Sequence, residues 1–393
     1  MLKGRDIIVV GLQSWDIQIG SNCKNIAIEF SKNNRVLYVN SAKDRLTLLK
    51  NNKHFNVFRK SNNELNLSEI STNLWVYSPS KIIESISSLS VNFLFDFLNK
   101  HNNKVFASEI KKAIKLLEFK DFILFCDSDM FRSFYLKELL NPKVYIYYTR
   151  DNLTAVKYWQ TQGCRIEPLH MAKADIVMAN STYLAQIASK NNHNSFFVGQ
   201  GCDLSAFKPE NIKSVPLDIA KIPQPIIGYI GALKTLRLDI EVIKHLAINK
   251  PNWNIVLVGP EDNEFAVCDL HQMANVWFLG AKPEVELPLY LKAFTVAINP
   301  QILNEVTIGN YPRKIDEYLA MGKPTVATKT IAMSFFDKYV SLASNQTEWV
   351  LAVEKELEGN TKEKEKNRIK FAAEHTWENN VNEIYRIVEQ YIK

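Results

Sequence analysis

Short apolar runs alternate with helical patterns along the whole chain. Residues 6–11, DIIVVG, are an apolar run that ends at a glycine and leads into a loop of small and polar residues. A helical stretch around residues 26–30 and a second apolar run at 35–39 come next. This order of strand, loop, helix and strand is typical of the opening of a doubly wound α/β domain. Further strands of this domain are predicted at residues 122–126, 144–148, 175–178 and 195–198.

The same alternation of apolar runs and helical patterns is repeated in the second half. Residues 208–225 carry four prolines and little periodicity, which predicts a linker. The last stretch, 376–393, has apolar residues at helical spacing and predicts an amphipathic terminal helix. Between these two segments, strands are predicted at residues 226–230, 254–258, 276–279, 295–298 and 325–327, and helices at 239–249 and 312–321. The pattern therefore predicts two α/β domains in series.

Composition agrees with this organisation. A chain of 393 residues is too long for one typical core, and 46% hydrophobic with 23% charged residues is a globular composition. No apolar run approaches the about 18 residues that a membrane span needs, and the first run reads as a buried strand rather than a signal peptide. The five cysteines are scattered without metal-ligand spacing. A reducing cytoplasm and no structural metal are therefore expected.

Charge is distributed unevenly along the chain. Residues 1–208 hold 27 Lys and Arg against 18 Asp and Glu, a charge of +9, whereas residues 209–393 hold 21 against 24, a charge of −3. A basic first half can face an anionic membrane surface or an anionic acceptor, or can be ordinary solvated surface. No motif supports nucleic-acid binding.

In α/β domains of this kind, ligands bind outside the carboxyl ends of the strands, in a cleft. The predicted strand at 226–230 is followed by Gly231, Lys234 and Arg237, and then by a helix that begins near Asp239. Two cations before a helix start suit a diphosphate, although an ordinary loop with surface charges has the same pattern. Gly259 and Gly280 each follow a strand, where a glycine allows backbone contact with a planar base but also serves a plain turn.

The predicted helix at 312–321 carries a possible nucleotide contact. Asn310 suits a helix cap and Pro312 suits the first helical position, so that the free N–H groups of the first turn would attract an anion. Glu317 lies one turn further on and offers two acceptor oxygens, which match the vicinal hydroxyls of a ribose. Arg313 and Lys314 precede Glu317 by four and three positions, a spacing that allows ion pairs on a helix. Spacing alone favours a salt-bridged surface helix, worth about 0.3–0.5 kcal/mol per pair.

The first half offers weaker signals. Trp15 and Asp16 lie in the loop 11–22 after the first strand and are residue types that contact sugars, although Asp16 also suits a turn. The missing G-x-G-x-x-G fingerprint argues against an NAD enzyme. Asp127-Ser-Asp129 follows another predicted strand of the first half, where it is expected to have a structural or substrate-side role.

Two basic segments of the first half raise the question of membrane contact. Residues 32–60 carry eight Lys and Arg and one acidic residue. Residues 110–117 place apolar positions at helical spacing with lysines between them, near the aromatic run at 91–97. A basic amphipathic helix of this kind can lie on an anionic membrane or can pack on its own sheet.

Several blocks of the sequence resemble known transferases. PRKIDEYLAMGKPTVAT resembles the P-x-K-x-x-E-Y-x-A-x-G-K-P-V-V-A segment of GT-B glycosyltransferases of family 4. GYIGALKTLRLDIEVIKHLA, PNWNIVLVGP and NVWFLGAKPEVELPLYLKAFTVAINP resemble the other blocks of their donor domain, in the same order. EPLHMAKADIVMANSTYLAQIA and GQGCDLSAFKP resemble the run that ends their acceptor domain. The resemblance covers about half of the chain and is nearest to transferases of bacterial envelope polysaccharides, including those of the teichuronic-acid type.

The resemblance implies a fold and its domains. It implies an α/β protein of GT-B architecture, in which two Rossmann-like, doubly wound domains face each other across a cleft and a C-terminal helix crosses back. Residues 1–208 would be the acceptor-side domain, residues 209–373 the nucleotide-sugar donor domain, and residues 374–393 a helix packing on the first domain.

The resemblance also implies roles for individual residues. Glu317 would bind the donor ribose, and Lys234 and Arg237, with Lys314, would lie near the diphosphate. Asn310, Tyr311 and Pro312 would bring helix amides to the distal phosphate and the sugar, and Gly231, Gly259 and Gly280 would line the nucleotide site. Asp16, Arg150 and Asp151 are the catalytic candidates of the first domain. No metal is expected, because amides and cations would stabilise the leaving charge.

The implied activity is a retaining glycosyltransferase of the hexosyltransferase type, with no cofactor and with a UDP- or GDP-sugar as co-substrate. The acceptor would be a saccharide or a lipid-linked saccharide, and the protein would be cytoplasmic, with peripheral contact to the inner membrane face. The alternatives are a GT-B nucleotide-sugar epimerase or hydrolase and a non-catalytic GT-B partner subunit.

The sequence departs from the family pattern at three places. Relatives commonly have a glutamate eight residues before the ribose glutamate; Gly309 stands there, and the nearest carboxylate is Glu305. The diphosphate pair of the family is usually Arg then Lys at wider spacing, whereas Lys234 precedes Arg237 here. The family histidine after a late first-half strand is also replaced, and Arg150 or Asp151 would take its place.

Overall fold

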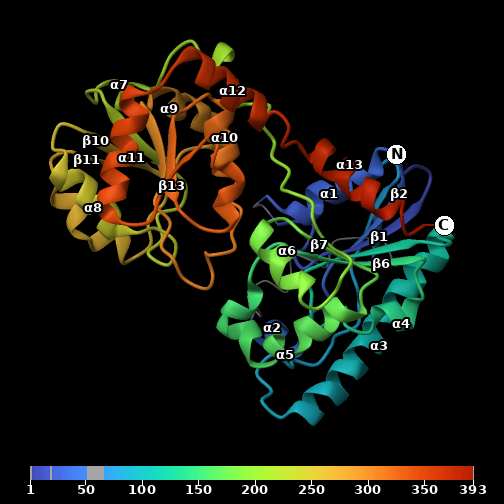
Figure 1. Ribbon diagram of the computed structural model, residues 1–393. Coiled ribbons are helices and arrows are strands. Elements are labelled where there is room, and N and C mark those ends of the chain that lie inside the picture. The colour runs from blue at the N-terminus through green and yellow to red at the C-terminus, as the bar shows by residue number, and fades with distance from the viewer. Residues whose placement is uncertain (1, 18–19, 51–65, 393) are drawn as a thin grey trace. The chain divides into compact units, whose positions relative to one another are not determined.

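The computed structural model describes residues 2–17, 20–50 and 66–392, which form two compact units. The first unit contains the residues up to Gly199 together with those from Trp377 onward, and the second contains Gln200–Thr376. Figure 1 shows that each unit is built on a sheet with helices on both faces.

The first unit is a mostly parallel sheet. Its strands are β1 (Asp6–Val10), β2 (Arg35–Val39), β3 (Leu67–Ser71), β4 (Leu74–Tyr77), β5 (Ile123–Asp127), β6 (Val144–Thr149), β7 (Ile176–Ala179) and β8 (Ser195–Phe197). They lie in the order β3-β4-β2-β1-β5-β6-β7-β8, and only β3 runs antiparallel to its neighbour. The helices are α1 (Asn22–Ser31), α2 (Arg45–Lys50), α3 (Asn92–Leu117), α4 (Leu136–Leu140), η2 (Leu153–Ala155), α5 (Lys157–Lys173), α6 (Thr182–Ser189) and α13 (Trp377–Val388).

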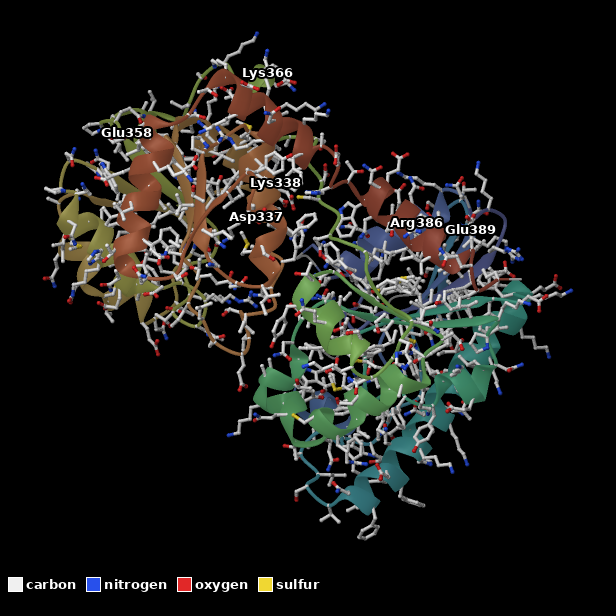
Figure 2. All side chains as sticks on the ribbon, in the orientation of Figure 1. Asp337, Lys338, Glu358, Lys366, Arg386 and Glu389 are labelled. Atoms are coloured by element: carbon white, nitrogen blue, oxygen red, sulfur yellow. The ribbon has the colours of Figure 1, made fainter. Side chains whose placement is uncertain are left out.

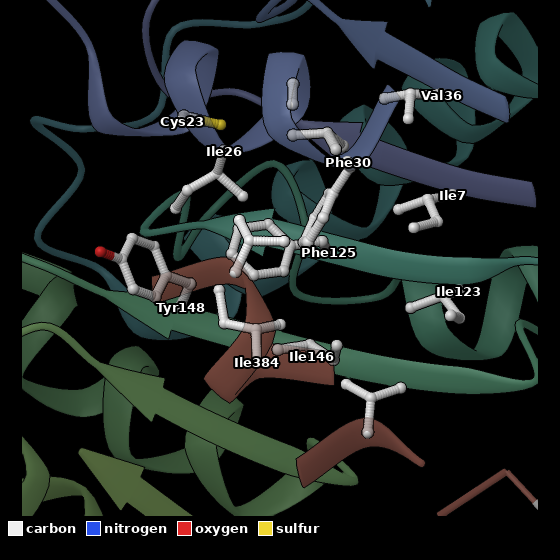
Figure 3. Packing of buried hydrophobic residues seen from close by; sticks show 14 of the residues in the cluster. Ile7, Cys23, Ile26, Phe30, Val36, Ile123, Phe125, Ile146, Tyr148 and Ile384 are labelled. Carbon is white, nitrogen blue, oxygen red and sulfur yellow. The ribbon is translucent and has the colours of Figure 1, made fainter. Parts of the chain in front are cut away.

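Both faces of this sheet are buried, which explains why its strands read as continuous apolar runs. Alternate residues of β1 serve the two faces: Ile7 and Val9 pack on one side, and Ile8 and Val10 on the other. The first face is covered by α1 and α13, and Figure 3 shows Phe30 of α1 and Ile384 of α13 in this cluster. The C-terminal helix therefore completes the core of the first unit.

The second unit is a parallel sheet of six strands. They are β9 (Ile226–Ile230), β10 (Asn254–Val258), β11 (Val276–Gly280), β12 (Val296–Asn299), β13 (Thr325–Thr328) and β14 (Ser341–Ala343), in the order β11-β10-β9-β12-β13-β14. The helices are η3 (Pro209–Asn211), α7 (Leu217–Ala220), α8 (Ile240–Asn249), η4 (Phe265–Val267), η5 (Asp269–Gln272), η6 (Glu284–Glu286), α9 (Leu287–Ala293), α10 (Lys314–Ala320), η7 (Ala332–Phe336), α11 (Gln346–Glu358) and α12 (Lys362–Ala372).

The proline-rich segment at 208–225 is not a free linker, so that prediction is wrong. Ile219 of α7 and Ile222 are buried in the same cluster as Ile226 and Ile230 of β9. Proline and turn residues suppressed the periodic signal there, but the few apolar side chains still pack on the sheet. The chain passes from the first unit to the second at Gly199–Gln200, ahead of this segment.

The strand order reverses once in each sheet. In the first unit the reversal lies between β1 and β5, and in the second unit it lies between β9 and β12. The loops that leave two such strands diverge to opposite faces and open a crevice at their carboxyl ends, where α/β proteins bind ligands. These two positions direct attention to the loops after β9 and β12 and to those after β1 and β5.

Candidate functional site

The loops that follow β9 and β12 are joined into one surface. Two backbone hydrogen bonds join them: Ile302 N–H donates to the Arg237 carbonyl at 2.9 Å, and Asp239 N–H donates to the Pro300 carbonyl at 2.9 Å. The side-chain amide of Asn304 donates to the Leu236 carbonyl at 2.9 Å. These bonds hold the segment that carries Lys234 and Arg237 against the segment that leads to α10. The structure thus brings together two groups of residues that the sequence keeps about 70 positions apart.

The loops after β9 and β10 approach each other at glycines. Gly231 has φ +142° and Gly259 has φ +154°, conformations that side chains disfavour. A Cβ at Gly259 would overlap the Gly231 carbonyl, 2.7 Å from its carbon and closer still to its oxygen. Gly259 N–H also donates to the Gly280 carbonyl at 2.9 Å. All three predicted glycines therefore lie at the carboxyl ends of neighbouring strands, where they present backbone rather than side chains.

The Lys314 side chain is directed toward the carboxyl end of β9. Its ammonium donates to the Tyr229 hydroxyl and lies 3.9 Å from the centroid of the Tyr229 ring, a cation–π contact. A Cβ at Gly231 would come within 2.6 Å of the same ammonium. Lys314 is thus a positive charge placed over the backbone of the loop after β9, while Lys234 and Arg237 on that loop are exposed.

Helix α10 begins later than predicted. It spans Lys314–Ala320 with Arg313 at the N-cap position, so Asn310 as a cap and Pro312 as the first helical residue are wrong. Asn310 N–H is used within the loop, where it donates to the Thr307 carbonyl at 3.0 Å. The Asn310 side chain serves the site differently: when its amide oxygen faces Arg237, it accepts from Nη1 at 3.3 Å. Asn310 therefore supports a cation of the neighbouring loop instead of starting the helix.

Glu317 lies one turn into α10 and is half-buried. Its carboxylate makes no hydrogen bond or ion pair within the part of the chain that the structure describes, so the salt-bridged surface helix favoured by spacing is wrong. Lys314 reaches Tyr229 instead. Burial raises the pKa of the Glu317 carboxyl, against the opposing effect of Arg313 and Lys314. A half-buried carboxylate without a protein partner is costly, and a hydrogen-bonding ligand would remove that cost.

Asp316 is a second carboxylate of α10 that the sequence did not single out. It is fully buried, and His375 Nδ1 lies 2.6 Å from its Oδ1, while the Tyr311 hydroxyl donates to the same oxygen at 3.3 Å. Burial raises the pKa of Asp316, and the hydrogen bonds from His375 and Tyr311 oppose that rise. His375 also accepts a backbone bond from Cys202 at 2.9 Å. These contacts anchor α10 to the last segment of the second unit, and no sequence spacing signals them.

The candidates of the first unit divide into a cluster and a single residue. Arg150 follows β6 and donates from Nε to Asp127 at 2.9 Å and from Nη1 to Asp151 at 3.0 Å. Asp127 is fully buried at the end of β5, and its second oxygen has no hydrogen-bond partner among residues 2–17, 20–50 and 66–392. Asp16 is exposed and makes no hydrogen bond or ion pair with any residue that the structure describes, so the structure does not join it to Arg150 and Asp151.

Two other first-half signals have structural roles. Trp15 is buried against Tyr38, with ring centroids 5.0 Å apart, and its backbone N–H donates to Asn40 Oδ1 at 2.8 Å. Asp129 pairs with Arg132 at 3.3 Å, just as Asp127 pairs with Arg150. The Asp-Ser-Asp motif is therefore neutralised by arginines. Across residues 2–17, 20–50 and 66–392, no group of three His, Cys, Asp or Glu side chains is placed to hold a metal ion.

The apolar face predicted at 110–117 packs inward. Ile110 and Ala113 of α3 are buried in the cluster beneath the sheet, so packing on its own sheet, not membrane contact, is the role of this face. Of the basic segment at 32–60, residues 51–60 lie outside the described residues. None of the helices in the described parts of the chain is both long and apolar enough to span a membrane.

Comparisons with known proteins agree with this geometry. Residues 224–356 match the family model described as Glycosyl transferases group 1, which confirms the resemblance for the second unit. A stretch of 174 residues is 29% identical to a Bacillus subtilis (strain 168) protein named "Putative teichuronic acid biosynthesis glycosyltransferase TuaH", and the match spans 42% of each chain. The chain thus spans less than half of this relative.

Solved structures extend the likeness to the whole fold. Sucrose-phosphate synthase from Thermosynechococcus elongatus matches with a TM-score of 0.64 at 15% identity, covering 98% of both chains. Anabaena Alr3699/HepE in complex with UDP matches with a TM-score of 0.63 at 14% identity, covering 98% of this chain and 100% of that one. The predicted fold class, two Rossmann-like α/β units of the GT-B type, is confirmed.

Proposed function

We propose that this GT-B chain, whose residues 224–356 match the group 1 glycosyl transferases, moves a sugar from a nucleotide-diphosphate sugar to a saccharide or lipid-linked saccharide acceptor. One observation carries the proposal. Glu317 is a half-buried carboxylate without a hydrogen-bond or ion-pair partner among the described residues, one turn into a helix that also directs Lys314 to the strand-order reversal of the second sheet. A nucleotide with a ribose and a diphosphate satisfies both groups.

Donor binding is assigned to the second unit. Glu317 accepts hydrogen bonds from the ribose hydroxyls, and Lys314, Lys234 and Arg237 neutralise the diphosphate. Gly231, Gly259 and Gly280 present backbone rather than side chains to the nucleotide. Asn310 supports Arg237, and the backbone N–H groups of Tyr311 and Arg313, on either side of Pro312, donate to the distal phosphate and the sugar.

The reaction proposed at this site retains the configuration of the sugar. The bond between the anomeric carbon and the diphosphate oxygen breaks, and a bond to an acceptor hydroxyl oxygen forms on the same face of the ring. The acceptor proton passes to the leaving diphosphate. The three cations stabilise the charge that develops on that group, and this electrostatic contribution makes a metal ion unnecessary. Arg150, Asp151 and Asp16 are assigned to the acceptor side, on the first unit.

Cell-envelope polysaccharide synthesis is the proposed context, supported by the name of the Bacillus relative. UDP-sugars are the first donors to test, since the Anabaena structures contain UDP or UDP-glucose. GDP-sugars remain the second choice. The chain is proposed to act in the cytoplasm at the inner face of the membrane.

A panel of nucleotide sugars in a thermal-shift assay tests the proposal, because a ligand that binds the folded state raises the melting temperature by mass action. The anomeric configuration of the product, determined by NMR, tests retention, and activity in EDTA tests metal independence. If no UDP, GDP or ADP compound binds and Glu317→Ala changes nothing, the enzyme assignment is wrong.

One feature favours the hydrolase or partner-subunit alternative. Gly309 is buried where relatives carry a glutamate, and Glu305 is exposed on the preceding loop. The donor sugar would therefore lack one carboxylate contact. Turnover of the donor without an acceptor would identify a hydrolase, and nucleotide binding without turnover on any acceptor would identify a partner subunit.

Membrane contact is proposed at the aromatic run 91–97 named in the sequence analysis, and not at the apolar face of residues 110–117. The first turns of α3 expose Phe93 by 76% and Phe97 by 71%, four positions apart on one face, and Lys100 and Lys104 continue that face. Aromatic side chains at the tip of a basic helix suit an anionic lipid surface. The apolar part of the proposed contact is thus at residues 93–97. The later turns of α3 are packed in the core and hold these residues in place.

The variant Phe93→Ser/Phe97→Ser is expected to lower binding to vesicles that contain phosphatidylglycerol by about tenfold, because two large apolar side chains no longer enter the lipid. Sedimentation with vesicles measures the bound fraction. The control is Val267→Ser/Val285→Ser, which removes two apolar side chains of the second unit that are 82% and 79% exposed. An equal loss in the control, or equal binding to uncharged vesicles, would contradict the assignment.

A further inference from the structure

The edge of the second sheet borders a cavity that contains none of the proposed donor-site residues. The cavity has a volume of about 770 Å³ and lies beside β14, the last strand of the sheet. Its walls come from the loop between β13 and β14 and from helices α11 and α12. A concave site of this size accommodates a small molecule.

Positive charge gathers in this cavity although the second half of the chain is acidic overall. Its lining includes five cations from the β13–β14 loop, α11 and α12: Lys329, Lys338, Lys355, Lys364 and Arg368. The first three are exposed, and their ammonium groups make no hydrogen bond or ion pair within the described parts of the chain. Lys364 donates to the Gly359 carbonyl at 2.8 Å, a neutral acceptor that leaves its charge uncompensated.

The acidic residues of the lining are largely occupied. Glu348 accepts from the Ser344 amide at 2.7 Å and from the Asn345 side chain at 2.9 Å, as part of the cap of α11. Glu356 accepts from the Ser341 hydroxyl at 2.7 Å and lies 3.9 Å from the Arg368 guanidinium. Asp337 is the third acid of the lining. The five cations therefore exceed the three acids, and a dianion would balance them.

Arg368 makes one wall of the cavity rigid. Its side chain is 3% exposed, and its Nε donates to the Gly322 carbonyl at 3.0 Å, just beyond the end of α10. Its Nη2 donates to Asn360. A buried guanidinium held at several points presents a fixed charge, which reduces the entropy lost when a ligand binds.

Hydroxyl, amide and aromatic groups also line the cavity, beside four apolar residues. These groups belong to Thr330, Ser334, Tyr339, Ser341 and Asn367. The Tyr339 ring is itself fixed, since it stacks on Phe371 with centroids 4.1 Å apart. Polar groups of this kind bind sugar hydroxyls, and lysines bind phosphate as point charges.

We propose that this cavity binds the phosphate monoester of a sugar, as a second ligand separate from the nucleotide. The phosphate is held by Lys329, Lys338 and Lys355 near Arg368, and the sugar ring meets the hydroxyl side of the lining. The proposal rests on residues outside the donor site, so it stands or fails independently of the proposed transferase activity.

Calorimetric titration of the full chain with glucose 6-phosphate, inorganic phosphate and glucose tests the site. Each titration is carried out without UDP and again with a large excess of UDP, so that a phosphate bound at the donor site is recognised by its displacement. Glucose 6-phosphate is expected to bind saturably, inorganic phosphate more weakly, and glucose not at all. Loss of binding when UDP is added, or equal binding of glucose, would overturn the proposal.

Matched variants locate the ligand. Lys338→Glu/Lys355→Glu changes two exposed residues of the lining, so folding is preserved, and it is expected to raise the Kd for glucose 6-phosphate by about tenfold or more. Lys366→Glu/Lys370→Glu makes the same charge change on α12 outside the lining, and it is expected to leave the Kd within about twofold; Figure 2 labels Lys338 and Lys366. An equal rise in both variants would show a general charge effect and would refute the site.

Discussion

Replacing Glu317 with alanine is expected to weaken nucleotide binding by about 1–3 kcal/mol, roughly 5- to 150-fold in Kd, because the ribose loses hydrogen bonds to a charged acceptor. Glu317→Gln keeps the shape of the side chain and one acceptor oxygen, so its loss should be smaller. Calorimetric titration with the nucleotide that the thermal-shift panel identifies measures both. The control is Glu358→Gln, at an exposed glutamate that ends α11 (Figure 2).

The same variants separate binding from stability. In the protein without ligand, burial raises the pKa of Glu317, so the folded state binds this proton more readily than the unfolded state does. Stability then decreases as pH rises from the ordinary glutamate pKa through the raised one, and the charged carboxylate is the costly form. Glu317→Gln removes that cost, and its melting temperature at neutral pH is expected to equal or exceed that of the unaltered chain. Lower affinity together with a lower melting temperature would instead indicate a structural role.

Nucleotide binding should depend on pH in the opposite sense. The ribose donates to the carboxylate, so binding favours the ionised form of Glu317. Affinity is therefore expected to fall as pH decreases through the raised pKa, and this fall should be absent in Glu317→Gln. An identical pH profile for the two proteins would exclude Glu317 as the titrating group.

Replacing Gly259 with alanine is expected to destabilise the second unit by roughly 3 kcal/mol or more, through overlap with backbone and an unfavourable φ. The added Cβ meets the Gly231 carbonyl, which belongs to the backbone just after β9 and cannot rotate away as a side chain would. The midpoint of urea unfolding, followed by far-UV circular dichroism, measures the loss. Nucleotide affinity should fall as well, because the two loops would have to separate.

Gly280→Ala is the matched control for this variant. Gly280 also has a positive φ, +68°, but a Cβ there would meet no atom within 4 Å. Only conformational strain remains, and a loss of about 1–2 kcal/mol is expected. If the two alanine variants lost the same stability, strain alone would explain the effect and the close approach of the loops would be unimportant.

Most of the fold was visible in the pattern of apolar runs. The strands predicted at 226–230 and 254–258 coincide with β9 and β10, because strands buried on both faces must be continuously apolar. The strands that escaped prediction are β3, β4 and β14. β3 (LSEIS) is largely exposed and β14 (SLA) has only three residues, so neither sequence contains a continuous apolar run. β4 (LWVY) is a continuous apolar run, but it is only four residues long and lies next to the edge strand β3.

The helix boundary at α10 shows the limit of local signals. Asn310 and Pro312 have the chemistry of a helix start, yet the helix begins at Lys314. Tyr311 is buried in the core, and its hydroxyl binds Asp316, which keeps the preceding residues in the loop. A tertiary contact outweighed the intrinsic preferences of two residues.

By itself, the sequence determined that this protein has two α/β units and that their ligand sites lie at the carboxyl ends of the strands. It could do so because burial and turn formation each require particular residue types at neighbouring positions. Only the tertiary structure decided what the charged residues do. Spacing on a helix gave Glu317 two cationic neighbours, but Lys314 reaches Tyr229 on β9, and the carboxylate has no partner among the residues that the structure describes. An ion pair depends on where side chains end in space, and strands that are far apart in sequence set that position.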